Sequence, residues 1–354
     1  MPGKREEYKR SKIANVCWFV GLAVLLYSYW LVMTNFVIRD FYDPQYALKA
    51  GRMEARMKEF PGHPPWVVMG SSRVEYGFRP GVIADRMNEK NAPMIFNFGL
   101  GGANLFRQLI CLRRLVEDGM KPRRVGIEIL GAVMSHELYL FVDDPNLTIR
   151  ARKDELGVYG SYCNSPENLR HDWICSRFNP AYKYGIKIPN QTLAWRLLPV
   201  PLIHEVGEKP PYDKWGWHPG PSAPIPESDF RHGFEIAKNQ YKDLFHDFKI
   251  SPDTDRALMQ ILDLCKNEGI EVFLFRTPES NVFQALYTPE ADTAIDSYIA
   301  KIKNQYSVPF IDARSWIGID GFTDGHHLNA TGGEKFTRRF VDELFQTGAS
   351  YAKP

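Results

Sequence analysis

The chain is short of cysteine and of excess charge. Five of its 354 residues are cysteine, and 44 lysines and arginines nearly balance 42 aspartates and glutamates, which leaves a formal net charge of +2. Because no lysine- or arginine-rich patch accompanies this balance, the sequence argues against nucleic acid as the main partner. With 44% hydrophobic and 24% charged residues, the chain has room for one large domain with an insertion, or for two small domains.

The few cysteines define no disulfide framework. Cys17 lies in an apolar N-terminal run, and Cys111 and Cys265 lie on apolar helix faces, where we expect buried thiols. Cys163 and Cys175 share the middle of the chain. A disulfide bond between these two, or two free thiols, both fit the sequence.

Metal-binding motifs are missing as well. Most histidines, together with Asp143 and Asp144, lack the close, repeated spacing of zinc ligands. We therefore predict no metal ion and no cofactor. The scattered histidines are His136, His171, His204, His218, His232 and His246.

One long apolar run is present near the N-terminus. The uncharged stretch 13–38 has 26 residues, about 39 Å as a helix against a hydrocarbon core of about 30 Å. It is longer than a signal-peptide core and has no Ala-x-Ala cleavage site, so we predict an uncleaved transmembrane anchor. Five basic residues precede the run and only Arg39 follows it before Lys49, which predicts a cytoplasmic tail at 1–12. The remaining chain then lies in the periplasm or outside the cell.

The segment after the anchor is predicted to be a juxtamembrane helix over residues 39–60. The proline-rich cluster at 61–65 ends it, because proline cannot continue a helix, and we place a domain boundary near residue 61. An α/β domain is expected over 61–346, followed by a C-terminal tail at 347–354.

Short apolar strands alternate with helices through this domain. Strands are predicted at 67–69, 94–98, 125–130, 272–275 and 308–311, with helices between them. This alternation predicts a parallel sheet covered on both faces, with reactive residues on the loops at the carboxyl ends of the strands.

Residues 135–250 do not follow the alternation and are rich in Pro, Trp, Tyr, His and Gly. We interpret them as a large irregular insertion, which acts as a lid or specificity element or as a docking surface for a partner. Its aromatic residues suit a sugar-binding groove, and structural packing of the insertion explains them equally well.

A candidate nucleophile follows the first strand. The stretch Pro65-Trp-Val-Val-Met-Gly70-Ser71-Ser72 reads as a buried strand that ends at a glycine and presents Ser72 on the turn. Such a turn is also common without catalysis. A catalytic role is favoured by Asp324 and His327. His327 could act as the base that a serine nucleophile needs, and Asp324 could orient its ring. Thr331 and Glu334 have the spacing of a capping box for the helix that follows.

These segments resemble the SGNH (GDSL-like) hydrolases. The resemblance rests on Gly70-Ser71-Ser72, on Asn97-Phe-Gly99-Leu-Gly101-Gly102 and on Asp324-Gly-His326-His327. More narrowly, the chain is similar to the membrane-tethered branch of DltD-like and alginate O-acetylation-type proteins. The resemblance implies a three-layer, flavodoxin-like parallel sheet and a catalytic triad of Ser72, His327 and Asp324. It also implies a multi-spanning membrane O-acyltransferase as a partner.

One departure concerns the oxyanion hole. The family usually carries an Asn after its third strand, and the equivalent stretch 125–134 has none at that place. The backbone N–H groups of Ser72 and Gly102 remain as candidate donors, with Asn104 or Asn97 as side-chain donors. Losing one donor typically costs about 10²–10³ in rate.

Other polar residues are expected near the site. Glu128, inside an apolar strand, is predicted to pair with an arginine such as Arg73 or Arg276, because an unpaired buried carboxylate is costly. Alternatively, Arg73 or Arg276 binds a carboxylate or phosphate of a substrate. His326 lines the pocket or faces water.

Two functions follow as hypotheses. The first is an extracytoplasmic serine esterase or O-acyltransferase that acts on an acyl ester or acylated glycan of an envelope or exported polysaccharide. The second, suggested by the missing Asn, is a weakly active or inactive SGNH-like subunit that binds a glycan or a membrane acyltransferase.

Overall fold

The central element is a five-stranded parallel sheet. The computed structural model describes residues 3–37, 40, 42–88, 92–135, 148–179, 212–221 and 224–351. The strand order is β2-β1-β3-β4-β5, and every neighbouring pair is parallel. The strands are β1 (Pro65–Gly70), β2 (Met94–Gly99), β3 (Arg124–Glu128), β4 (Glu271–Arg276) and β5 (Phe310–Asp312). The predicted parallel α/β sheet is confirmed.

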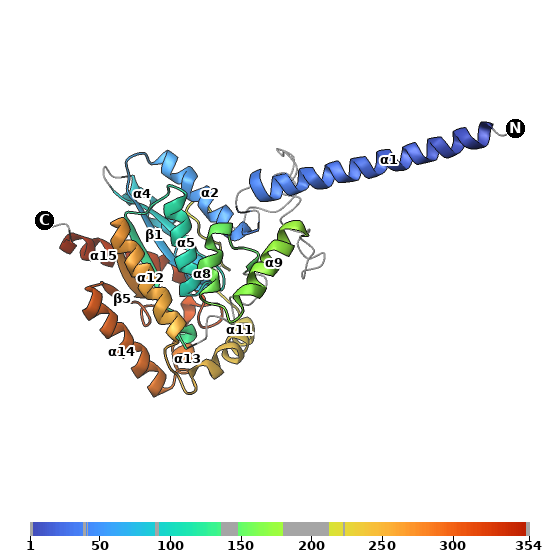
Figure 1. The fold of residues 1–354 in the computed structure, drawn as a ribbon. Coiled ribbons are helices and arrows are strands. Elements are labelled where there is room, and N and C mark those ends of the chain that lie inside the picture. The colour runs from blue at the N-terminus through green and yellow to red at the C-terminus, as the bar shows by residue number, and fades with distance from the viewer. Residues whose placement is uncertain are drawn as a thin grey trace. The chain divides into compact units, whose positions relative to one another are not determined.

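Helices cover both faces of this sheet. Helices α5 (Leu105–Glu117) and α12 (Pro252–Glu268) pack side by side (Figure 1), and α14 (Pro289–Tyr306) joins α12 through a 2.8 Å hydrogen bond from Tyr298 to Asp255. Helix α15 (Ala330–Tyr351) packs instead against α3 (Ser72–Gly77). Its Phe340 contacts Phe275 of β4 and Phe78 after α3. Buried apolar side chains from the sheet and both helix layers form the core.

The chain divides into two compact units, which we describe separately. The α/β unit comprises Leu48–Phe141 and Gly207–Pro354, and the other comprises Met1–Ala47 and Val142–Val206. The boundary therefore lies near residue 48 and not near residue 61. The reason lies in α2 (Pro44–Glu59), whose buried Lys49 donates hydrogen bonds to the carbonyls of Gly216 and Asn97.

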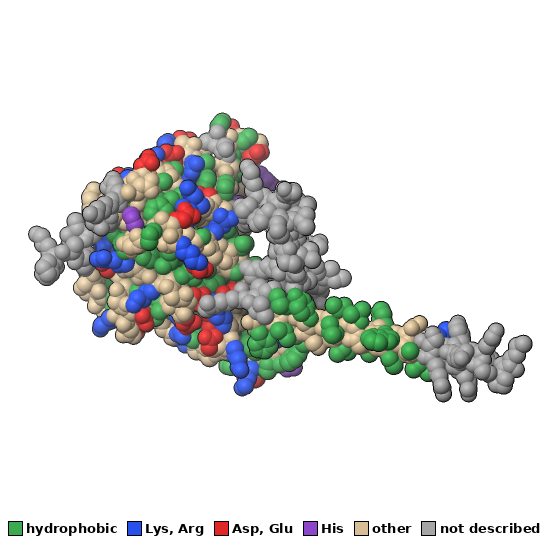
Figure 2. All heavy atoms as spheres, turned by 90° about the horizontal axis from the view of Figure 1, so that it is seen from above, with side chains coloured by type: hydrophobic (Ala, Val, Ile, Leu, Met, Phe, Trp, Pro, Cys, Tyr) green, Lys and Arg blue, Asp and Glu red, His purple; other side chains and the backbone are tan. Residues whose placement is uncertain are grey.

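The N-terminal unit contains the apolar helix. Helix α1 (Gly3–Val32) continues into a π-helix, Met33–Val37, and residues Lys12–Phe36 are long and apolar enough to cross a membrane. Figure 2 shows exposed hydrophobic side chains along this helix. The same unit holds a 3₁₀ turn, Lys153–Glu155, and the helices α8 (Leu156–Gly160) and α9 (Pro166–Phe178).

The region predicted as irregular contains helices. In addition to α8 and α9, it includes α11 (Glu227–Tyr241) and a 3₁₀ turn, Lys242–Phe245. Its composition concealed them, because prolines at 166 and 226 lie at helix starts, where their missing N–H is tolerated. Residues 136–147 and 180–211 of the predicted insertion lie outside the described residues. Cys163 and Cys175 are not bridged.

Shorter elements complete the α/β unit. They are α4 (Ala84–Met87), α13 (Asn281–Gln284) and the 3₁₀ turns Pro80–Ile83, Gly131–Val133 and Ile319–Gly321.

The start of α15 corrects the predicted capping box. The helix begins at Ala330, so Thr331 lies within its first turn. Asn329 performs the capping, because its Oδ1 accepts a 2.9 Å hydrogen bond from the N–H of Gly332. The side-chain amide of Asn329 donates a hydrogen bond to the carbonyl of Asp320, which holds the capping side chain in place.

Candidate active site

Ser72 stands at the junction of β1 and α3. The chain bends at Gly70, where a Cβ would collide with the side chains of Val74 and Glu128, so only glycine fits. Ser71 is the N-cap of α3, and its Oγ accepts a 3.2 Å hydrogen bond from the N–H of Arg73. Ser72 is thereby the first residue of the helix, and it is partly exposed.

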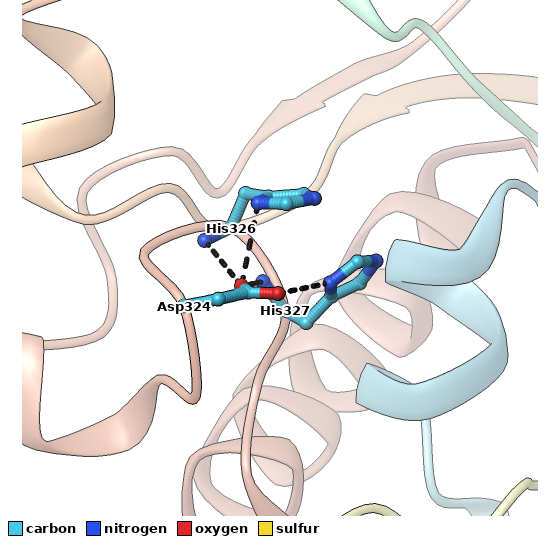
Figure 3. A group of neighbouring side chains, drawn as sticks. All are labelled: Asp324, His326 and His327. Atoms are coloured by element: carbon cyan, nitrogen blue, oxygen red, sulfur yellow. Dashed lines mark hydrogen bonds and ion pairs between the residues drawn. The ribbon is translucent and has the colours of Figure 1, made fainter. Parts of the chain in front are cut away.

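Asp324, His326 and His327 lie on one tight loop before α15. Gly325 adopts a left-handed conformation with φ of 92°, and Thr323 donates a 2.8 Å hydrogen bond to the carbonyl of His327. Asp324 Oδ1 accepts the backbone N–H groups of His326 at 3.1 Å and His327 at 2.8 Å (Figure 3). The aspartate therefore fixes the backbone of the residues whose side chains it contacts.

The two distant segments meet at Ser72. His327 Nδ1 lies 2.7 Å from Asp324 Oδ2, and His327 Nε2 lies 2.8 Å from Ser72 Oγ. In this arrangement Nδ1–H donates to the carboxylate, which leaves Nε2 to accept the serine proton. These are the contacts that a serine nucleophile, its base and an orienting carboxylate require.

The charge state of Asp324 suits that role. Burial opposes its ionisation, but the hydrogen bonds and electrostatic attraction from His327 outweigh burial and lower the pKa of the carboxyl group below its ordinary value. Asp324 therefore stays ionised at neutral pH.

His326 is buried and lies outside the reach of a substrate. Only 5% of it is exposed, and its ring packs against Phe283 and Tyr241, with centroid distances of 5.2 and 5.3 Å. Burial, aided by the charges of His327 and Arg73, lowers the pKa of His326 well below its ordinary value, so the ring is neutral at pH 7. The predicted substrate-binding role for His326 does not fit this placement.

Candidate oxyanion donors lie at the ends of two neighbouring strands. The β1–β2 register pairs Gly70 with Gly99, which brings the turns that carry Ser72 and Gly102 to the same edge of the sheet. Within the described part of the chain, the backbone N–H groups of Ser72 and Gly102 have no hydrogen-bond partner. Both are available to an oxyanion.

The two predicted side-chain donors differ. Asn104 is the N-cap of α5, where its Oδ1 accepts a 2.9 Å hydrogen bond from the N–H of Arg107 and its amide group is left to donate. Asn97 is fully buried, and its amide donates to the carbonyls of Val74 and Phe78. Asn97 is therefore unable to serve an oxyanion.

The predicted partners of Glu128 were wrong. Its Oε2 accepts the N–H of Ser71 at 2.6 Å, and its Oε1 accepts the hydroxyl of Thr277 at 2.9 Å. These bonds satisfy the buried carboxylate without an arginine, and they fix the turn before Ser72.

Both predicted substrate-binding arginines are committed elsewhere. Arg73 is buried in an ion pair with Glu279, which also accepts hydrogen bonds from Tyr287 and Arg314. Arg276 is buried beside Asp296 and Asp312. Each guanidinium group is buried and its charge is already balanced by these carboxylates, which argues against the predicted role for either residue.

Tyr76 adjoins the site and was missed from the sequence. Its ring lies edge-on to His327 at a centroid distance of 5.5 Å and edge-on to His218 at 4.8 Å. The N–H of His218 donates to the carbonyl of Glu75, and the indole of Trp217 donates to that of Tyr76. The available signal was the i, i+4 spacing of Tyr76 from Ser72 on a short helix.

The loop also offers metal-ligand atoms. One atom each from Asp324, His326 and His327 lie within 4.8 Å of one another, which is close enough to hold an ion. However, Asp324 and His327 already bond each other and His327 contacts Ser72, so a metal ion would have to break these contacts.

Comparison with known proteins identifies no family of known function. A protein-family model without a functional description matches residues 235–348, which include Asp324 and His327 but not Ser72. The match covers less than half of the chain. No curated protein matches the sequence.

Proposed function

We propose that this chain is a membrane-anchored serine acyl-transfer enzyme of the SGNH hydrolase type. The observation that carries the proposal is the continuous contact from Asp324 through His327 to Ser72, with distances of 2.7 and 2.8 Å. Ser72 begins helix α3 and His327 lies on the loop before α15, 255 positions later. A hydroxyl, an imidazole and an ionised carboxylate in this order have the chemistry of a catalytic triad.

The first step forms an acyl-enzyme. Ser72 Oγ attacks the carbonyl carbon of an ester while His327 Nε2 accepts the serine proton. The resulting oxyanion is held by the N–H groups of Ser72 and Gly102, with the amide of Asn104 as a third donor. The ester C–O bond then breaks, and His327 returns the proton to the leaving alkoxide.

The second step releases the acyl group. A water molecule or a sugar hydroxyl gives its proton to His327 and attacks the acyl-enzyme. Ser72 leaves and recovers its proton. Water yields a free acid, and a sugar hydroxyl yields a new O-acyl ester, so the same residues serve an esterase or an O-acyltransferase.

The fold supports the SGNH assignment. The order β2-β1-β3-β4-β5 is the flavodoxin-like order of doubly wound sheets, in which ligands bind at the carboxyl ends of the strands. Ser72, Gly102 and the Asp324–His327 loop follow β1, β2 and β5, respectively. Fold alone does not determine activity, so the proposal rests on the side chains.

The proposed membrane topology supports an extracytoplasmic substrate. Helix α1 anchors the chain in the cytoplasmic membrane, with the N-terminus in the cytoplasm because basic residues precede the span. The α/β unit then faces the periplasm or exterior, where an acylated envelope or exported glycan is the available ester. A multi-spanning membrane O-acyltransferase is the proposed acyl donor or partner.

A fluorophosphonate probe tests the proposal, because it bonds covalently to an activated serine. We expect the full-length protein in detergent to be labelled, and Ser72→Ala to remove the label. Ser71→Ala is the matched control, since it deletes the adjacent hydroxyl and loses only a helix cap, worth about 1 kcal/mol. Absence of labelling in the wild-type protein, or its persistence in Ser72→Ala, would refute the triad.

A second assay divides the two reactions. Hydrolysis of p-nitrophenyl acetate is measured with and without a glycan acceptor, and mass spectrometry identifies acylated acceptor. Acylated glycan indicates an O-acyltransferase, and acetate alone indicates an esterase.

One observation favours the alternative, a weakly active or inactive subunit that binds a glycan or a membrane partner. Glu128 takes the position at the end of β3 near the family's Asn, and it accepts hydrogen bonds, so it adds no donor for an oxyanion. Glycan binding without probe labelling would favour this alternative.

A further inference from the structure

Helix α9 is fastened to the apolar helix through its C-terminal carbonyl groups. The hydroxyl of Tyr27 donates a 2.5 Å hydrogen bond to the carbonyl of Phe178, and the amide of Asn35 donates a 3.3 Å bond to the carbonyl of Arg177. The last carbonyls of a helix have no partner within it. Here two of them are satisfied by side chains that belong to the candidate membrane span.

These contacts place the end of α9 alongside the span and not beyond it. Tyr27 precedes Phe36, the last residue of the span, by nine positions, or roughly 13 Å of helix. Backbone polar groups at such a depth must be paired within the protein, because lipid offers no partners. The bonds from Tyr27 and Asn35 meet that requirement.

The side chains at the same end of α9 are apolar and uncovered. Ile174 and Phe178, four residues apart on one face, are 42% and 60% exposed, and Phe36 of the π-helix is 85% exposed. An adjoining side of the helix is held by Arg177, whose guanidinium donates to the carbonyls of Ile149 and Ala151. The indole of Trp173 also donates to Ala151.

We infer that the C-terminal half of α9 lies in the bilayer leaflet nearest the C-terminal end of α1, with Ile174 and Phe178 against lipid acyl chains. The inference rests on the proposed anchor and is independent of the proposed catalysis. The ligand of this surface is lipid hydrocarbon, because the surface continues the exposed apolar surface of the span itself. Trp173 then lies at the interface, where amphipathic rings are favoured.

Crosslinking of the native full-length chain tests this placement. The protein is reconstituted in lipid nanodiscs that contain a phospholipid with a diazirine on its acyl chain, and the labelled peptides are identified after irradiation. Trypsin separates residues 171–177, which contain Ile174, from the control segment 154–170 of the same unit. We expect labelling of 171–177 and of α1, and not of 154–170.

Two variants isolate the contact with α1. Tyr27→Phe removes the hydroxyl that holds Phe178, and losing a hydrogen bond of about 1 kcal/mol should lower labelling of 171–177 by up to about 5-fold. Tyr29→Phe is the matched control, since Tyr29 makes no hydrogen bond to α9 among the described residues. Equal labelling in the two variants would overturn the inference.

Spin labels distinguish lipid from water and from protein. A nitroxide is placed singly at position 174, 178, 22 or 168 in a cysteine-free chain, and its collisions with oxygen and with a water-soluble nickel chelate are compared. We expect oxygen to dominate at 174 and 178, as at the span residue Leu22, and nickel to dominate at Asn168. Dominant nickel collisions at 174 and 178 would overturn the inference, as would weak collisions with both reagents, which indicate a covering protein. Water exposure at Leu22 would instead refute the anchor.

Discussion

The imidazole rings of His326 and His327 pack against each other in a tilted arrangement, with centroids 3.9 Å apart and planes inclined by 41°. Both residues also contact Asp324 (Figure 3). Because burial keeps His326 neutral, the ring supports His327 without opposing the positive charge that His327 acquires when it takes the serine proton. His326 thereby positions His327 and does not itself contact a substrate.

A fixed charge at position 326 is expected to suppress activity. His326→Arg places a guanidinium group, which stays charged even when buried, about 4 Å from the ring of His327, where like charges repel by about 4 kcal/mol at an effective dielectric constant of 20. We expect kcat/KM for p-nitrophenyl acetate to fall at least about 10²-fold. His326→Phe, which keeps the ring packing against Phe283, should retain activity within a small factor. Equal losses in both variants would show that the imidazole itself is required.

Much of the site was predictable because it follows strand ends. Ser72 and the Asp324–His327 loop were placed on the carboxyl ends of parallel strands from apolar runs alone, and those ends share one edge of the sheet. The short spacing between Asp324 and His327 made their contact local. A turn of this size brings the two side chains together independently of the tertiary fold.

Long-range pairing was not predictable from the same patterns. Glu128 was expected to pair with an arginine such as Arg73 or Arg276, because an unpaired buried carboxylate is costly, but Arg73 pairs with Glu279, 206 positions away. Lys49 was placed in a predicted juxtamembrane helix, and nothing in its neighbourhood indicates that its partners are the carbonyls of Asn97 and Gly216. The partners of buried charged groups depend on which groups the fold buries together, and the spacing of residues in the sequence does not reveal those partners.

Asn104 allows the third oxyanion donor to be tested apart from helix capping. Ser caps a helix about as well as Asn, so Asn104→Ser keeps an acceptor for the N–H of Arg107 but removes the amide donor. We expect the thermal midpoint to change little and kcat to fall by about 10²–10³. Unchanged kcat with an unchanged midpoint would mean that the backbone N–H groups of Ser72 and Gly102 act alone.

Asp324→Asn should disable the imidazole without unfolding the loop. An amide in place of the carboxylate favours the wrong tautomer of His327, and in serine hydrolases this change typically costs about 10⁴ in kcat. We expect a similar drop in the rate of fluorophosphonate labelling. Asp320→Asn, at an exposed carboxylate four positions earlier, is the control and should label at the wild-type rate. A loss below tenfold for Asp324→Asn would contradict the orienting role.

Lys49 predicts a pH dependence of stability that is separate from catalysis. Burial lowers the pKa of this lysine to about 7, against opposing attraction from Glu75 and Asp213, while the unfolded chain keeps the ordinary value near 10.5. Between these values the unfolded state binds one more proton than the folded state, so the free energy of unfolding rises with pH, by at most about 1.4 kcal/mol per pH unit. Lys49→Met removes this titration but also the bonds to Gly216 and Asn97. In urea unfolding between pH 7.5 and 9, we expect the wild-type protein to gain stability relative to Lys49→Met as pH increases. A difference that stays constant over this interval would show that Lys49 is charged in the folded protein.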